Sequence, residues 1–141
     1  MPQLRVRDVM TADPVTLEED EDLDLASQLM SLARIRHLPV VKEGRVVGIV
    51  SERDLLRAQA SRLDEGSAEE RQAMNRWVKA GWVMTRGVQQ VEPEMPLLEA
   101  ARLMRTHKYG CLPVVEQGRL VGILTEADFL DYAIQQLERM D

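Results

Sequence analysis

One short phrase of hydroxyl and carboxylate residues occurs twice in the chain. Ser51–Asp54 reads SERD, Thr125–Asp128 reads TEAD, and each follows an apolar run that begins with glycine. Either phrase can start a helix, with Ser or Thr as the N-cap and the Asp three residues later as its capping-box partner. The same place can bind a ligand, because a helix N-terminus attracts phosphate and a nearby carboxylate can accept hydrogen bonds from a ribose diol. The two uses are compatible, and the residues by themselves favour the cap.

A repeat with a period of 74 positions surrounds this phrase. Residues 8–56 align with residues 82–130 without a gap, and twenty of the 49 paired positions are identical. The matches include VMT, at residues 9–11 and 83–85, and the apolar run LPVV. A match that runs through whole elements indicates two copies of one supersecondary unit, here a pseudo-symmetric pair.

Each copy predicts the order β-α-β-β-α. Short strands are expected at Pro14–Leu17 and Val88–Val91, and an amphipathic helix follows each, with Leu, Ala and Met at helical spacing. Apolar runs on both sides of Glu43-Gly44 and of Gln117-Gly118 predict two hairpins, each followed by a second helix. Because the hairpins are apolar almost throughout, their sheets should be covered on both faces. We therefore expect an α/β (α+β) fold whose two units pack through their sheets as one body.

Residues 64–79 connect the two copies and predict another helix. Ser67 and Glu70 suit a capping box at its start, and Met74, Trp77 and Val78 form an apolar stripe. The stripe favours a packed connector, and a helix that binds a partner protein is the second interpretation.

Composition argues against several classes of function. The 141 residues carry a net charge of −6 and no basic stripe, so nucleic-acid binding is not expected unless exposed arginines gather locally. The single cysteine and the two histidines match no zinc spacing, and no catalytic motif is present, so we expect neither an enzyme nor a metal site. The sequence contains no recognisable signal peptide and no apolar run long enough to span a membrane, which predicts a cytoplasmic protein.

The chain resembles the cystathionine β-synthase (CBS) domain family in its tandem, stand-alone form. Three markers carry the resemblance, and each occurs twice in the same order: VMT, then LPVV-x-x-G-x-x-x-GI, then the [S/T]-x-x-D junction. The first CBS motif would cover residues 5–63 and the second residues 80–137, with a connecting helix at 64–79. Pairs of this family bind adenosine-containing ligands in clefts between the two copies, and two pairs commonly form a disc-like homodimer. The resemblance thus implies a regulatory, energy-sensing module with no required cofactor.

The resemblance also implies two sites of unequal strength. In the stronger site, cationic side chains would face the phosphates of AMP, ADP or ATP, while the hydroxyl and carboxylate of the junction would contact phosphate and ribose. Other residues would line the adenine pocket or reach in from the second copy, and NAD and S-adenosylmethionine are further candidate ligands. The residues of this site are Arg36, His37, Ile49, Ser51, Arg53, Asp54, Tyr109 and Gly110.

The second site keeps the ribose-binding pair but lacks the cations. Ala127, Gly110 and Cys111 stand where the first copy has an arginine, another arginine and a histidine. We expect this site to be weaker, empty or suited to an uncharged adenosine. Its residues are Asp13, Ile35, Arg36, Cys111, Ile123, Thr125 and Asp128.

Two interpretations of the whole chain stay open. In the first, a nucleotide binds, the pair changes shape, and an unidentified effector protein reads the change. In the second, the chain is a structural dimerisation module whose degenerate clefts bind nothing. We expect Cys111 to belong to the pocket wall or the core and not to act as a nucleophile. Neither interpretation includes a membrane partner.

Overall fold

The computed structural model describes residues 3–61 and 67–140, and within them the chain forms two compact units. The central unit is Val15–Val88, and the terminal unit combines Met1–Pro14 with Gln89–Asp141. These boundaries differ from those of the sequence repeat, because the first residues of the chain join the second half.

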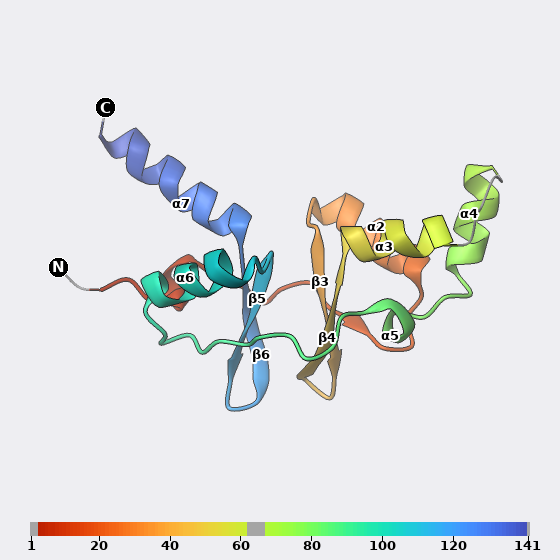
Figure 1. The fold of residues 1–141 in the computed structure, drawn as a ribbon, viewed down its shortest axis with the longest axis horizontal. Coiled ribbons are helices and arrows are strands. Elements are labelled where there is room, and N and C mark those ends of the chain that lie inside the picture. The colour runs from red at the N-terminus through yellow and green to blue at the C-terminus, as the bar shows by residue number, and fades with distance from the viewer. Residues whose placement is uncertain (1–2, 62–66, 141) are drawn as a thin grey trace. The chain divides into compact units, whose positions relative to one another are not determined.

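The central unit is a three-stranded sheet with helices packed beside it (Figure 1). In the sheet order β2-β3-β4, β2 is parallel to β3, and β3 and β4 form an antiparallel hairpin. Glu43 and Gly44 both have positive φ at the hairpin turn, which glycine adopts without strain. The elements are β2 (Leu17–Glu18), α2 (Leu23–Ala33), β3 (His37–Lys42), β4 (Arg45–Ser51), α3 (Glu52–Ser61), α4 (Ala68–Asn75) and α5 (Ala80–Val83).

The terminal unit also has a three-stranded sheet, but its third strand lies on the other side of the hairpin: β1 is antiparallel to the second hairpin strand, whereas β2 is parallel to the first. Its sheet has the order β1-β6-β5, with β5 and β6 as an antiparallel hairpin whose register matches that of β3 and β4 position by position. In Figure 1, α7 extends from the end of β6 to the C-terminus. The elements are α1 (Val6–Val9), β1 (Thr11–Ala12), α6 (Leu97–His107), β5 (Cys111–Glu116), β6 (Arg119–Thr125) and α7 (Glu126–Arg139).

Each unit has its own aliphatic core, as the scarcity of aromatic residues requires. Leu17, Leu38 and Val50 are fully buried in the central unit, and Leu112 and Leu124 are fully buried in the terminal unit. The mixed α/β fold with two repeated units is as the sequence predicts.

The two VMT segments complete the sheet that belongs to the other copy of the repeat. Thr11 pairs with Ile123 on β6, and Thr85 forms a bridge with Ile49 on β4 through two backbone hydrogen bonds of 2.8 and 3.0 Å. The repeat predicts that both copies contain the same elements, but it does not say which copy each segment joins.

Gly48 is needed for this packing. A Cβ at Gly48 would lie 2.6 Å from Met84 Sδ, and the same relation holds between Gly122 and Met10. The missing side chain at each glycine therefore leaves room for the methionine of a VMT segment.

Two of the predicted elements are shorter than expected. The strand expected at Pro14–Leu17 begins only at Leu17, after Asp13 takes a positive φ of 48°. The strand expected at Val88–Val91 is a single bridge between Val91 and Val114.

No helix among the described residues is both long and apolar enough to cross a membrane.

Candidate functional site

The Asp54 junction is a complete capping box at the start of α3. Asp54 N–H donates to Ser51 Oγ at 3.1 Å, and Ser51 N–H donates to Asp54 Oδ2 at 2.8 Å. Among the described residues, the other carboxylate oxygen, Oδ1, has no hydrogen-bond partner. The cap therefore uses one acceptor oxygen of Asp54 and leaves the second for another donor.

The Asp128 junction has the same capping box, but both carboxylate oxygens of Asp128 are engaged. Oδ2 accepts from Thr125 N–H at 2.8 Å and from Thr125 Oγ1 at 3.2 Å. Oδ1 accepts from the hydroxyl of Thr11 at 2.8 Å. Thr11 belongs to the first VMT segment, so the exchange of these segments brings a hydroxyl donor to the carboxylate.

Thr11 was not among the residues that the sequence singled out. It lies 117 positions from Asp128, and no local spacing relates the two. The only available signal was the co-occurrence of VMT with the junction in both copies. In the central unit, the hydroxyl of Thr85 forms no hydrogen bond among the described residues, so the two junctions differ in this contact.

Cationic side chains lie beside the Asp54 junction. Arg36 and Arg53 are exposed, and the carbonyl of Arg36 accepts from Glu52 N–H at 2.8 Å, which fixes the start of β3 against the start of α3. His37 pairs with Ser51 in the hairpin register. Five predicted residues of the stronger site thus meet where β3 begins, β4 ends and α3 begins, and Ile49 is buried in β4 beside them.

The remaining predicted residues of the stronger site belong to the terminal unit. Tyr109 and Gly110 form the partly buried loop between α6 and β5, and the ring of Tyr109 stacks on His107 with centroids 5.2 Å apart. The structure thus places six of the eight residues in the central unit and two in the terminal unit.

The residues of the weaker site divide in the opposite way. Cys111 pairs with Thr125 in the hairpin register, and Ile123 lies two residues earlier on β6. Asp13 is exposed and donates its N–H to Val121 O at 3.2 Å in the same unit. Ile35 and Arg36 belong to the central unit.

Burial suppresses the reactivity of Cys111. The side chain is 6% exposed, and desolvation raises the pKa of the thiol to about 12. A thiol that stays protonated at neutral pH is a poor nucleophile and a poor metal ligand. Within residues 3–61 and 67–140, no group of three His, Cys, Asp or Glu residues is arranged to hold a metal ion.

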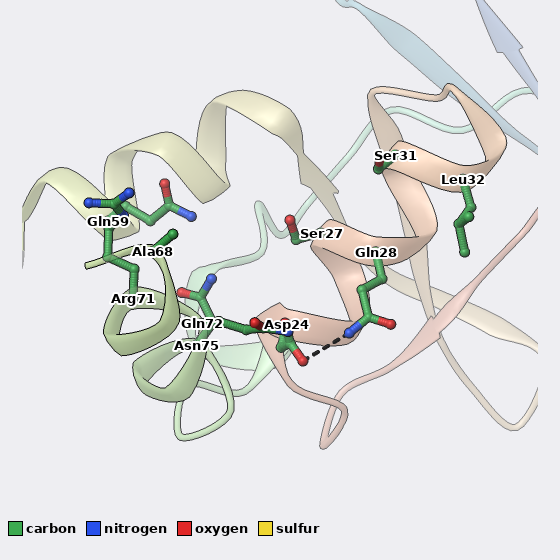
Figure 2. A pocket seen from close by; sticks show the side chains of 10 residues that line it. All are labelled: Asp24, Ser27, Gln28, Ser31, Leu32, Gln59, Ala68, Arg71, Gln72 and Asn75. Carbon is green, nitrogen blue, oxygen red and sulfur yellow. Dashed lines mark hydrogen bonds between the residues drawn. The ribbon is translucent and has the colours of Figure 1, made fainter. Parts of the chain in front are cut away.

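A polar cavity of about 530 Å³ lies between α2, α3 and α4, and Figure 2 shows the side chains that line it. Asp24 is buried on α2, and its Oδ2 accepts from Gln28 Nε2 at 3.0 Å and lies 3.5 Å from Arg76 Nε. Asn75 of α4 is also buried, whereas Trp77 is 80% exposed. The described lining residues include none of the predicted site residues, so this cavity is separate from both junctions.

The cavity also corrects one expectation about the connector. Ser67 caps α4 by accepting from Glu70 N–H at 3.1 Å, which is one of the two hydrogen bonds of the predicted capping box. However, only part of the apolar stripe packs: Val78 is partly buried against the core, whereas Met74 and Trp77 are exposed and the polar Asn75 is buried. The connector thus contacts α2 through its polar side chains.

One family model matches both copies of the repeat, and each match includes a VMT segment, a hairpin and a junction. The model described as the CBS domain matches residues 6–61 and again residues 78–135. The chain belongs to the CBS domain family. A CBS domain-containing protein from Dictyostelium discoideum is 36% identical over 135 residues, which is 94% of this chain and 93% of that protein.

Solved structures of CBS pairs share this fold. The CBS domain pair of MJ0100, solved in complex with 5′-methylthioadenosine and S-adenosyl-L-methionine, is 26% identical with a TM-score of 0.80, covering 96% of this chain and 99% of that one. CBSX2, whose source is Arabidopsis thaliana, was solved in complex with AMP; it is 30% identical with a TM-score of 0.76, over 93% and 96% of the two chains.

Other curated relatives are much longer than this chain. The chain spans 41% of the length of one protein from Methanocaldococcus jannaschii and 23% of a homoserine O-acetyltransferase from Methanococcoides burtonii. The matched region is a minor part of that enzyme, so its activity is not transferred to this chain.

Proposed function

We propose that this chain is a regulatory module that senses an adenosine-containing ligand through the Asp54 junction and signals to an effector protein. The ligands we propose are AMP, ADP and ATP, with NAD and S-adenosylmethionine as further members of the same chemical class. Relatives of the same fold, solved with AMP and with S-adenosyl-L-methionine, support this choice.

One observation carries the proposal: the second oxygen of the Asp54 carboxylate. Asp54 Oδ1 has no donor among the described residues, whereas both oxygens of Asp128 already accept hydrogen bonds. The Asp54 carboxylate suits a ribose hydroxyl. The capping box holds one oxygen, so the carboxylate is already oriented before the ligand binds, and the other oxygen can accept from the ribose. Arg36 and Arg53 add guanidinium donors for phosphate.

The Asp128 junction would then be the weaker site. A ribose hydroxyl there has to replace the donor hydroxyl of Thr11, so the gain from the new hydrogen bond is offset by the loss of the old one. Ala127 also supplies no cation. We infer that this site is suited to an uncharged adenosine.

Isothermal titration calorimetry tests the proposal with two ligands that differ in the phosphate. AMP should bind the unmodified chain, and Arg53→Ala should weaken AMP while leaving 5′-methylthioadenosine unchanged, since that ligand has no phosphate. Arg119→Ala, which removes an exposed arginine from the second hairpin, is the matched control. No heat from AMP, ADP, ATP, NAD or S-adenosylmethionine at millimolar concentration would contradict the proposal.

A second candidate function is structural dimerisation with clefts that bind nothing. It is favoured by the capping boxes, which are complete without a ligand. It is also favoured by α7, none of whose residues is buried and whose Leu130, Ile134 and Leu137 leave an exposed apolar stripe at helical spacing.

We propose that a second copy of the chain covers the α7 stripe in either function. Leu130→Glu should dissociate a homodimer in sedimentation velocity, whereas Gln135→Glu, which places the same charge off the stripe, should not. A dimer that survives Leu130→Glu would show that the interface lies elsewhere. A firm dimer that ignores every nucleotide would favour the structural function.

A further inference from the structure

The repeat places two equivalent helix faces in the molecule, and they are covered differently. Positions 24, 28 and 32 on α2 correspond to positions 98, 102 and 106 on α6, and residues at all six positions line a cavity or groove. On α2, helix α4 lies against this face and lines the cavity with it, as Figure 2 shows. The molecule therefore already contains one example of a short helix seated on this face.

On α6 the corresponding face is an open groove of about 450 Å³. Of the described residues that line it, Gln3 alone comes from outside the segment 96–107. The chain enters both helices in the same way, since Leu23 N–H donates to Val78 O and Leu97 N–H donates to Leu4 O, each at 2.9 Å. The two chain entries thus have the same backbone arrangement, and among the described residues a helix in the position of α4 covers only the α2 face.

The side chains of the two faces differ in charge. Buried Asp24 on α2 becomes Leu98 on α6, which is 58% exposed, and Gln28 becomes the exposed Arg102. Arg105 and Lys108 are also exposed, and among the described residues none of these three cations forms an ion pair. Glu99 is the one carboxylate among the described lining residues.

We propose that the α6 groove docks an acidic amphipathic helix of a partner protein, in the position that α4 takes on α2. An apolar residue of that helix covers Leu98, and its carboxylates face Arg102 and Arg105. A two-fold contact of this face with itself is the poorer match, because it sets the cations of one copy near those of the other. Nucleic acid is the poorer match, because the chain is acidic overall and Leu98 offers it no phosphate contact.

The docking site does not depend on nucleotide binding, so it can fail or succeed separately from the proposed function. The probe is a fluorescein-labelled, helix-stapled peptide of about four turns, with leucines along one face and glutamates beside them. Its control peptide carries lysines in place of the glutamates. Binding to the full chain is followed by fluorescence anisotropy, and backbone amide shifts in NMR locate the contact.

The acidic peptide should bind and shift the amides of Leu98 and Arg102, and the lysine peptide should bind more weakly. Arg102→Glu should weaken the acidic peptide about tenfold, whereas Arg119→Glu, the same charge reversal on the second hairpin, should not. Equal binding of the two peptides, equal effects of the two variants, or preferential binding of a single-stranded oligonucleotide would overturn the proposal.

A fused helix removes the dependence on the affinity of a free peptide. The acidic helix is fused to the N-terminus so that it ends at residue 1. By the repeat of 74 positions, residue 1 corresponds to residue 75, where α4 ends, so docking becomes intramolecular. The fusion should raise the midpoint of urea unfolding, and Leu98→Glu should remove the gain. A fused acidic helix that gives no more stability than its lysine counterpart would also overturn the proposal.

Discussion

The two junctions predict opposite consequences for the same substitution. Asp54→Ala removes one return hydrogen bond, from Ser51 N–H at 2.8 Å, and should lower the free energy of unfolding by about 0.5–2 kcal/mol. Asp128→Ala removes the equivalent bond and also the acceptor for the Thr11 hydroxyl. That additional hydrogen bond is worth about 0.5–1.5 kcal/mol, so Asp128→Ala should cost about 1–3.5 kcal/mol in total.

Ligand affinity should follow the reverse order. If Asp54 Oδ1 accepts from the ribose, Asp54→Ala loses a hydrogen bond to a charged group, and AMP should bind about tenfold to a hundredfold more weakly. Asp128→Ala should change AMP affinity much less. The crossed pattern separates a capping role from a binding role, because a cap alone affects stability and not affinity.

Urea unfolding measures the stabilities, and calorimetric titration with AMP measures the affinities on the same preparations. Asp54→Asn is the control that keeps the shape of the side chain and removes its charge. The reasoning is refuted if Asp54→Ala lowers stability by the expected amount and leaves the affinity for AMP intact. It is also refuted if Asp128→Ala is the less destabilising of the two alanine variants.

Three further predictions concern single contacts. Thr11→Val should lower the free energy of unfolding by about 1 kcal/mol and raise the affinity of the Asp128 junction for 5′-methylthioadenosine, because one carboxylate oxygen is released. Gly48→Ala should destabilise the chain by about 1–3 kcal/mol in urea, because the new Cβ meets Met84 Sδ and Thr85 O within 3 Å. Since burial raises the pKa of Cys111 to about 12, stability should fall as pH rises above about 9, and Cys111→Ala should remove this dependence.

Matched variants control these three measurements. Thr85→Val changes the equivalent hydroxyl, which forms no hydrogen bond among the described residues, and should cost less than Thr11→Val. Adding Met84→Ala to Gly48→Ala should cost less than the two changes summed, since the methionine no longer occupies the space. For Cys111 the sign follows from linkage: above pH 9 the unfolded thiol loses its proton and the buried one keeps it. A rise in stability with pH would contradict the burial of the thiol.

The local features of this molecule could be predicted from sequence, because they depend on residues close together in the chain. Both capping boxes follow from a hydroxyl residue and an aspartate three positions apart. The hairpins follow from β-branched runs around a glycine turn. The family resemblance rested on the same local markers, and the family model confirms it.

The contacts between distant segments could not be predicted in this way. The Thr11–Asp128 hydrogen bond joins residues 117 positions apart, and a doubled motif does not say which copy of VMT reaches which sheet. For the same reason, the packing of Met84 on Gly48 could not be predicted from the sequence. For the connector the apolar stripe was only partly informative, because Val78 packs on the core while Met74 and Trp77 are exposed and the polar Asn75 is buried. Amphipathic spacing identifies a helix but does not identify the element that covers it.

The available oxygen of Asp54 is the central claim, and a crystal structure of the chain with AMP tests it most directly. The account predicts a ribose hydroxyl within hydrogen-bond distance of Asp54 Oδ1, with the phosphate near the Arg53 side of α3 and the Thr11–Asp128 hydrogen bond retained. AMP bound at Asp128 with the Asp54 junction empty would contradict the account.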